Sequence, residues 1–534
     1  MMVPKRQNAL RRLGCGIALA GLLAVIPFAS AGAGAENTGV VSNALQRNGM
    51  YAAEEPLSIP PSPSQKRGNP TEEQEASDPQ TLAIGIGDAL LTALENNHAL
   101  AIERLNPAIR RTFEDQEAAS FDPVLSGDAS YSRQEAEGEQ ANGSDAGVEV
   151  SKLFSTGTQA GIEISNDRTW SDLYGDQHTT RAGLNLRQSL LRGAGRKVNL
   201  ASLRQARIDT FSSRHEFRGF VESFIADVEK TYWEYALSLR RIEIFTESLN
   251  LAEHQMKETE ERIRIGVLPE IEHVAAQAEV ALRKEDLINA RSELAKVRLR
   301  LLRLLNPSGS GLWDREIVLQ DQPAVPEVNL EGVDVHVDVG LRMRSDLNQA
   351  RMQQERGDLE VVKTRNGLLP RMDFFITLGM SGYADSFSGS IEDIDGRNYD
   401  VGAGISLEYP FFNRDAKARH ERAVFSSSQA DESVRNLEQL VQMDVRSAYI
   451  EVNRTREQVS ATAATRALQE EKMRAETEKF RVGKSTSLLV AQTQRDLVAS
   501  RIAEIQAIVG YLTSLIDLYR LEGSLLERRG ITLP

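Results

Sequence analysis

The 534-residue sequence predicts a mainly α-helical protein that also carries a membrane β-sheet. Three observations support this fold class. Two long stretches, 197–265 and 414–482, contain no proline and are rich in Ala, Glu, Arg, Leu and Gln. Several short segments alternate apolar and polar residues, as strands with one apolar face do. The same order of elements occurs twice along the chain, which indicates duplication.

The N-terminus has the pattern of a signal peptide over residues 1–35. Basic residues precede an apolar stretch at 13–28 and a small-residue tract, ASAGAGA, at 29–35. A retained membrane anchor is the alternative, although this apolar stretch is short and rich in glycine. The sequence's one cysteine, Cys15, lies inside the signal, so the mature chain is expected to hold no disulfide and no cysteine metal site. Residues 36–80 are polar and predict a disordered lead-in.

The charge of the chain bears on its partners. The formal net charge is −14, and nucleic acid requires a basic face, so no nucleic-acid partner is expected. After residue 35 no run approaches the roughly 18 apolar residues that a spanning helix needs. A crossing of the membrane would therefore have to use a β-barrel.

The rest of the chain divides into a first repeat at 81–329, a second repeat at 330–526 and a C-terminal tail at 527–534. The two repeats correspond at three kinds of feature. These are the strand openings at 122–124 and 369–371, the strand-to-helix junctions LRQSLLRGAG (186–195) and LEYPFFNRDA (407–416), and the helix breaks ERIRIGVLPEI (261–271) and EKFRVGKSTSLL (478–489).

The helices of this plan are unusually long. Each proline-free stretch is expected to form a helix of about 100 Å at 1.5 Å per residue, a length typical of coiled coils. Shorter helices are expected to lie beside them in two end-to-end stacks, 269–305 with 341–367 and 485–526 with 88–120. The segment 307–338, with its prolines and β-branched residues, predicts a small mixed belt partway along.

Four strong candidate strands are present in each chain. The alternation is clearest at 371–381 and 399–408 in the second repeat and at 181–187 in the first. For any single segment, a half-buried sheet of a soluble protein is the alternative. Four strands cannot close a barrel, and lipid does not tolerate open edges, whereas three chains would supply about twelve strands. The sequence therefore predicts an oligomer.

A further pair of segments, 147–154 and 158–168, is joined by STGT and has the pattern of an additional hairpin. The four-strand count leaves this hairpin out. Three interpretations remain open: an extracellular loop, an insertion into the duct, or an extra strand pair.

From Leu82 to about Leu526 the sequence resembles the TolC family of outer-membrane factors. No single motif is decisive, but their order and spacing, repeated twice, carry the resemblance. The motifs are LLRGAGR (190–196), Pro370 before a strand, YPFFN (409–413), RIRIG (262–266) and KFRVG (479–483). The first junction departs from the family habit, because Ser189 stands where the second repeat has Pro410.

The resemblance implies a homotrimer with four strands per protomer in a 12-stranded outer-membrane barrel and a long helical barrel in the periplasm. It implies a passive, gated exit duct in a tripartite efflux pump or a type I secretion system. The implied partners are a periplasmic adaptor protein, an inner-membrane pump or ABC exporter, and outer-membrane lipid. We expect no cofactor.

By resemblance, adaptor contacts and gate elements lie at the two helix-tip turns. A glycine suits each tight reversal because it can adopt positive φ, and a simple helix cap is the alternative role. The candidates are Arg264, Gly266, Val267, Leu268, Arg481, Val482, Gly483, Lys484 and Ser485.

A pore constriction is the second candidate site. In the family pattern, acidic residues six and nine positions beyond the second tip glycine select cations, but here Leu489 and Gln492 occupy those positions. Glu270 and Glu272 are the candidate replacements, because Glu272 lies six positions beyond Gly266. The alternative is that both glutamates only interact with the helix dipole.

Motifs that suggest catalysis are incomplete. VGKST (482–486) follows a helix and has Glu478 where a phosphate loop needs glycine. Two pairs have the Glu-x-x-His spacing of metal-binding bundles, Glu95 with His98 and Glu270 with His273. The helix plan puts these two pairs at different heights, so we expect no metal site and no enzyme.

A periplasmic coiled-coil structural or adaptor protein without a barrel is the alternative class. It would share the signal peptide and the long helices. The alternating segments at corresponding places in both repeats argue against it. Within the duct interpretation, the sequence does not distinguish efflux from protein secretion.

Overall fold

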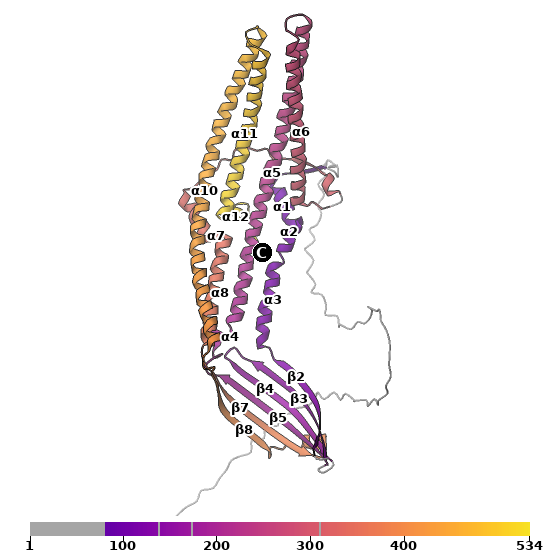
Figure 1. Cartoon of the computed structure of the whole chain (residues 1–534), viewed down its shortest axis with the longest axis vertical. Coiled ribbons are helices and arrows are strands. Elements are labelled where there is room, and N and C mark those ends of the chain that lie inside the picture. Colours follow the sequence, from indigo (N-terminus) through magenta and orange to yellow (C-terminus); the bar gives the residue numbers. More distant parts are fainter. Residues whose placement is uncertain (1–80, 137–138, 172–174, 309–310, 534) are drawn as a thin grey trace, which may run out of the picture. The chain divides into compact units, whose positions relative to one another are not determined.

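The computed structural model describes residues 81–136, 139–171, 175–308 and 311–533, all within one compact unit. The predicted signal peptide (1–35) and lead-in (36–80) lie outside the described residues. The described chain consists of a bundle of long helices and a large antiparallel sheet (Figure 1).

Two long helices form the frame of the bundle, α5 (Ala201–Arg264) and α10 (Arg414–Arg481). Their 64 and 68 residues correspond to lengths of about 96 and 102 Å. Neither contains proline, so no residue interrupts the backbone hydrogen bonds. The predicted long helices are confirmed.

Shorter helices pack beside this frame, but their stacking differs from the expected one. Both α8 (Ser345–Gly367) and α11 (Ser487–Leu521) pack against α10 and α5, so they lie end to end along these two long helices. In the same way, α3 (Asn106–Ala118) and α6 (Ile271–Leu305) both pack against α5. Both expected pairings, 269–305 with 341–367 and 485–526 with 88–120, are therefore wrong. Helix lengths alone fit either pairing, whereas the tip turns fold α6 back on α5 and α11 back on α10 (Figure 1).

The expected single helix at 88–120 is broken into pieces. It forms α1 (Ile86–Asn96), α2 (His98–Glu103), α3 and a short 3-10 turn (Ala119–Phe121). The Asn97 side chain accepts hydrogen bonds from the N–H groups of Ala99 and Leu100 and so starts α2. Pro107 lies in the first turn of α3, where its missing N–H costs nothing.

The predicted belt is confirmed as a small mixed region beside the middle of α5. Strands β1 (Thr81–Ile84) and β6 (Glu316–Leu319) pair in parallel there. A 3-10 turn (Leu312–Asp314) precedes β6, and α7 (Val333–Met343) follows it. Two tyrosines of α5 hold the pair: the Tyr232 hydroxyl donates to the Ile84 carbonyl at 3.2 Å, and the Tyr235 hydroxyl donates to the Ile317 carbonyl at 3.1 Å.

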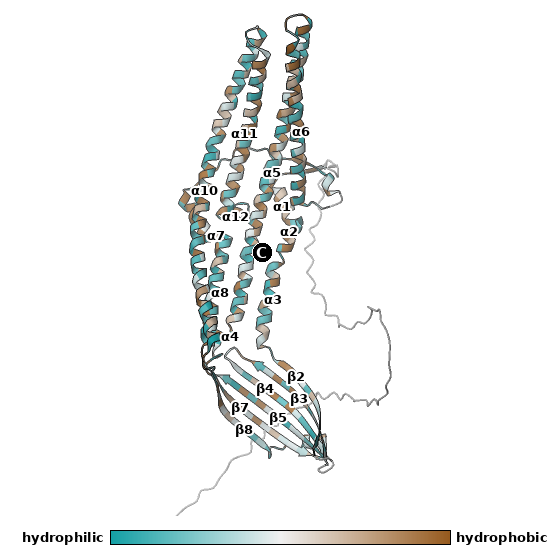
Figure 2. Ribbon diagram, in the orientation of Figure 1, coloured by the Kyte–Doolittle hydropathy of each residue, from teal (hydrophilic) through white to brown (hydrophobic). Residues whose placement is uncertain are grey.

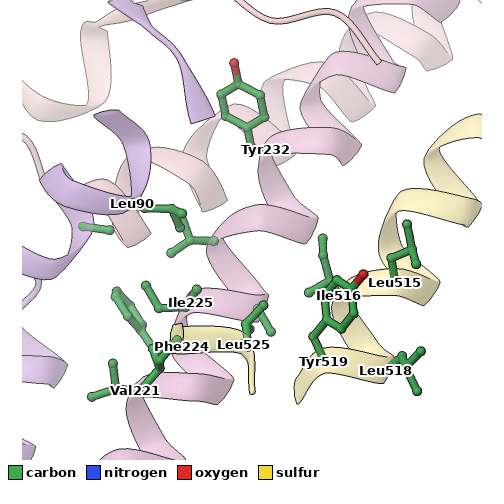
Figure 3. Packing of buried hydrophobic residues seen from close by; sticks show 14 of the residues in the cluster. Leu90, Val221, Phe224, Ile225, Tyr232, Leu515, Ile516, Leu518, Tyr519 and Leu525 are labelled. Carbon is green, nitrogen blue, oxygen red and sulfur yellow. The ribbon is translucent and has the colours of Figure 1, made fainter. Parts of the chain in front are cut away.

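The hydrophobic core lies where α5, α11, α1 and the short helix α12 (Leu525–Arg528) meet (Figure 3). Fully buried aliphatic side chains such as Ile225, Ile516 and Leu525 each stabilise the fold by about 1.5–3 kcal/mol. Beyond α12, Arg529 forms an ion pair with the buried Glu229 of α5 at 2.6 Å.

Helix α11 corrects one expectation. Among the described helices it alone is long and apolar enough to cross a membrane, although no such run was expected after residue 35. Its apolar side chains Leu515, Ile516 and Leu518 are buried in the core. The composition of α11 is therefore explained by its packing against α5 and α10.

The large sheet has six strands in the described residues rather than the expected four. In spatial order they are β2 (Val124–Ala136), β3 (Glu139–Leu153), β4 (Thr158–Ser171), β5 (Gly175–Ser189), β7 (Arg371–Ala384) and β8 (Tyr399–Glu408). Every neighbouring pair is antiparallel. The additional hairpin is β3–β4, an extra strand pair inside the sheet, because continuous ladders join it to β2 and β5. The short helix α9 (Phe387–Glu392) lies between β7 and β8 in sequence.

Candidate functional site

The six-stranded sheet has one apolar face. Residues paired across neighbouring strands point to the same side, so the register identifies each face. One complete row is apolar in all six strands: Leu125, Val150, Ile162, Leu184, Leu378 and Val401. All six side chains are exposed, Leu125 to 70%. An exposed apolar face of this extent fits contact with lipid.

The opposite face is polar. The next row contains Ser126, Glu149, Glu163, Gly183, Gly379 and Asp400. Above Gly379, Arg181 of β5 reaches Asp400 of β8 at 2.7 Å. Figure 2 shows that hydrophobic and hydrophilic residues occur along the same strands, as this alternation requires. The predicted alternation of 371–381, 399–408 and 181–187 is confirmed.

The apolar face comes close to the height of the apolar band of a membrane barrel, which is about 25 Å. Along β8, it extends from Tyr399 to Leu407, which is about 27 Å along the strand and about 20 Å along the membrane normal at a tilt of about 40°. Aromatic side chains lie near both ends. Towards the end of the sheet away from the helices, the ring centres of Tyr131 and Trp170 lie 5.9 Å apart. At the other end, Phe411 is 94% exposed where the chain leaves β8 for α10. Aromatic residues at both interfaces are typical of membrane barrels.

The two helix tips are built in the same way. At the first tip, Gly266 has φ 77°, its N–H donates to the Ile263 carbonyl, and the Val267 N–H donates to the Arg262 carbonyl. At the second tip, Gly483 has φ 75° and the corresponding bonds run to Phe480 and Lys479. Both tips are Schellman turns that satisfy the last carbonyl groups of α5 and α10. The predicted reversals centred on the two glycines are confirmed, and a capping role is part of their function.

The tips expose apolar side chains. Most predicted tip residues are exposed, with Leu268 and Ser485 half-buried. The exposed apolar set is Ile265, Val267, Ile271, Val274, Val482, Leu488 and Leu489. Two of the three charged candidates are paired locally, Arg264 with Glu261 and Arg481 with Glu478. Ser485 donates a hydrogen bond to Glu476, which together with Lys479 lowers the pKa of that carboxyl group.

Three contacts join the α5–α6 hairpin to the α10–α11 hairpin near the tips. The guanidinium of Arg262 lies 4.8 Å from the centre of the Phe480 ring, a favourable cation–π position. Ser487 donates a hydrogen bond to the carboxylate of Glu272. These two contacts lie beside a cavity of about 150 Å³, across which Arg495 approaches Glu279 at 3.8 Å.

The four candidate constriction residues differ in their exposure and contacts. Glu272 is half-buried and bonded to the second hairpin, whereas Glu270 is exposed at the start of α6 and caps nothing. Leu489 and Gln492 are exposed on α11. Sequence reasoning missed Arg262, Phe480 and Ser487 as linking residues. Arg262 and Phe480 lie inside the RIRIG and KFRVG motifs, but only the tertiary structure shows that they meet.

Known proteins show the same architecture. The sequence matches the outer membrane efflux protein family over residues 89–307 and 339–524. No curated protein matches the chain. Three similar solved structures are the outer-membrane channel OprN (TM-score 0.64, 17% identity, 82% of this chain and 90% of that chain), the Campylobacter jejuni CmeC outer membrane channel (0.62, 15%, 82% and 86%) and the Vibrio cholerae outer membrane protein VceC (0.62, 14%, 82% and 96%). At these identities the likeness concerns the fold.

Proposed function

This chain belongs to the outer membrane efflux protein family, and from that premise we propose that three copies of it form one gated exit duct. The protein is an outer-membrane channel with a large periplasmic helical portion. The observation that carries the proposal is the apolar row that crosses all six strands from Leu125 to Val401, with a polar row behind it. One face suits lipid and the other suits a water-filled lumen.

Assembly follows from the edges of the sheet. In the described part of the chain, β2 and β8 each have one edge without a strand partner. Unpaired backbone N–H and C=O groups are not tolerated in hydrocarbon, so the sheet needs other copies to close it. The number three rests on the family resemblance. A periplasmic coiled-coil protein without a barrel would have no use for an exposed apolar face of this height.

The helix tips would control entry into the duct. The contacts of Arg262 with Phe480 and of Glu272 with Ser487 hold the two hairpins of one protomer together. The exposed apolar tip residues, among them Val267 and Val482, would bind a periplasmic adaptor. Flow through the duct is passive, and the energy comes from an inner-membrane pump or ABC exporter. The cargo of an efflux pump and that of a type I secretion system would both use this path.

Fractionation of cells tests the proposal. The full chain with its signal should be recovered from the outer membrane by detergent, with a native mass three times that of the mature protomer. The trimer should form without disulfides, because the one cysteine, Cys15, lies in the predicted signal peptide. Recovery as a monomer from the soluble periplasmic fraction would overturn the proposal.

A further inference from the structure

We propose that the membrane wall of this duct is an eighteen-stranded barrel, closed by pairing of β2 of one protomer with β8 of the next. The inference rests on the proposed trimeric duct and concerns its width. The observation behind this inference is that the β3–β4 hairpin lies inside the sheet, between β2 and β5. Three copies of a six-stranded sheet give eighteen strands, whereas four strands per protomer would give twelve.

The hairpin shares the division between lipid and lumen faces. Val150 of β3 and Ile162 of β4 lie in the apolar row, directly between Leu125 and Leu184. The row beside it continues the pattern with Val148 and Ile164. A loop outside the membrane or a plug inside the lumen would not need an apolar face in register with its neighbours. The hairpin therefore has the pattern of wall strands.

The turn of the hairpin is fixed to the junction that leads into α5. The Ser189 N–H donates to the Gly157 carbonyl at 3.1 Å, and the Gly195 N–H donates to the Thr156 carbonyl at 3.0 Å. The Asn199 side chain adds a bond to the Ser155 carbonyl at 3.2 Å. A Cβ atom at Gly157, which has φ 87°, would lie 2.2 Å from the Gly193 carbonyl oxygen. The close fit at Gly157 indicates that the turn of the hairpin is a fixed part of the wall, at the end of the sheet next to the helices.

The strand directions permit closure. The six strands alternate in direction, so β8 of one protomer runs opposite to β2 of the next and can pair with it as an antiparallel neighbour. The eighteen strands then alternate around the whole ring, as strands of a closed membrane barrel do. The occupant of each exposed edge is therefore a second copy of this chain.

The number of strands sets the perimeter of the wall. Eighteen strands spaced about 4.8 Å and tilted by about 40° give a perimeter of about 113 Å, and twelve give about 75 Å.

The width has a consequence for cargo. A perimeter of about 113 Å corresponds to a backbone diameter of about 36 Å, compared with about 24 Å for twelve strands. Such a wall leaves an open aqueous lumen, as eighteen-stranded barrels do. Size selection would then take place at the helix tips and not in the membrane.

Cysteine labelling tests the place of the hairpin. In a chain whose Cys15 is replaced, Glu163→Cys should react with a membrane-impermeant maleimide, and the adjacent Ile162→Cys should be protected by lipid. The matched control in an undisputed wall strand is Thr377→Cys against Leu378→Cys in β7. Equal labelling of both β4 positions, with alternation kept in β7, would overturn the eighteen-stranded wall and leave the duct standing. Loss of alternation in both strands would contradict the duct as well.

Deletion of the hairpin tests the width. Strand β2 ends and β5 begins at the same end of the sheet, so deleting Glu139–Ser171 joins them by a short turn and leaves four strands. In planar bilayers, polyethylene glycols of increasing size should enter the wild-type lumen up to a diameter about 1.5-fold larger than in the deletion variant, if both have open tips. An equal size limit in both proteins would overturn the inference. If the variant does not assemble, the labelling result decides.

Discussion

The backbone N–H of Ser189 donates a hydrogen bond to the carbonyl oxygen of Gly157 at 3.1 Å. This bond ties the end of β5 to the turn of the β3–β4 hairpin. The corresponding position of the second repeat is Pro410, which has no N–H to donate. The departure of the first junction from the repeat pattern is therefore linked to the extra strand pair.

Replacing Ser189 tests this link. Ser189→Pro removes the donor and leaves the Gly157 carbonyl unpaired, which should cost about 1–3 kcal/mol. Ser189→Ala is the matched control, because it keeps the N–H and loses only the 3.1 Å bond from the hydroxyl to Asp373. The melting temperature of the detergent-solubilised trimer should fall clearly more for proline than for alanine. Equal losses would show that the backbone bond has no role in stability.

The tip glycines should not tolerate a side chain. Gly266→Ala and Gly483→Ala would each force a Cβ into left-handed backbone at about 1–2 kcal/mol, although nothing lies within 4 Å of the added atom. Gly510→Ala in α11 is the opposite case, since it lies in a helix with open space and should gain about 1 kcal/mol. Thermal unfolding of the three variants measures both the loss of stability expected at the tips and the gain expected in α11. A neutral result at both tips would remove the argument for strained reversals there.

The contact of Glu272 with Ser487 should hold the tips closed. Glu272→Ala and Ser487→Ala remove the same hydrogen bond between the two hairpins, so each should raise the mean single-channel conductance, and the double variant should add little more. Glu270→Ala is the control, because Glu270 is exposed and caps nothing. A similar increase in the Glu270 variant would point to a general effect of charge rather than to release of this contact.

Glu222 should make stability depend on pH. Burial raises the pKa of its carboxyl group to about 7, against the opposing effect of Arg218. The folded chain therefore keeps a proton between about pH 4.5 and 7 that the unfolded chain releases, so the free energy of unfolding falls as pH rises through this window. The slope is at most about 1.4 kcal/mol per pH unit for each protomer.

Glu222→Gln should remove this contribution. The difference in melting temperature between pH 5 and pH 8 is expected to shrink in the variant, since glutamine does not titrate. Melting curves in the same detergent at both pH values measure it. An unchanged difference would mean that Glu222 is ionised in the folded protein throughout.

The lumen wall should favour cations. On the polar face of the hairpin, Asp145 lies directly opposite Asp167, and Glu149 lies opposite Glu163, with no basic residue on that face of either strand. Repeated around the ring, these carboxylates create a negative potential. Replacing all four by Asn or Gln should move the reversal potential in a KCl gradient towards the non-selective value. Glu135→Gln on the outer face should not, and an equal shift there would assign the effect to total charge.

The long elements could be predicted from sequence because their causes are local. Proline-free stretches rich in Ala, Glu and Leu favour the helices α5 and α10 locally, and the two tip glycines mark where the chain reverses. Strands β7 and β8 alternate cleanly enough to be found. The stacking of α8 with α11 and the contact of Arg262 with Phe480 depend on tertiary packing, which no local pattern encodes.

The strand count failed for a related reason. The segments 147–154 and 158–168 have the pattern of a hairpin, but neither segment shows by itself whether that hairpin joins the sheet. Their apolar positions become meaningful only when the register aligns Val150 and Ile162 with Leu125 and Leu184. Pairing between strands, rather than the sequence of either one, places the hairpin in the sheet.

The most direct test is single-channel recording from the detergent-extracted trimer in planar bilayers. A gated duct predicts discrete, long-lived conductance steps that are small in the wild type and larger in the Glu272→Ala variant. A well-folded trimer that stays silent even with Glu272 and Arg262 both replaced by alanine would contradict a gated duct through the outer membrane.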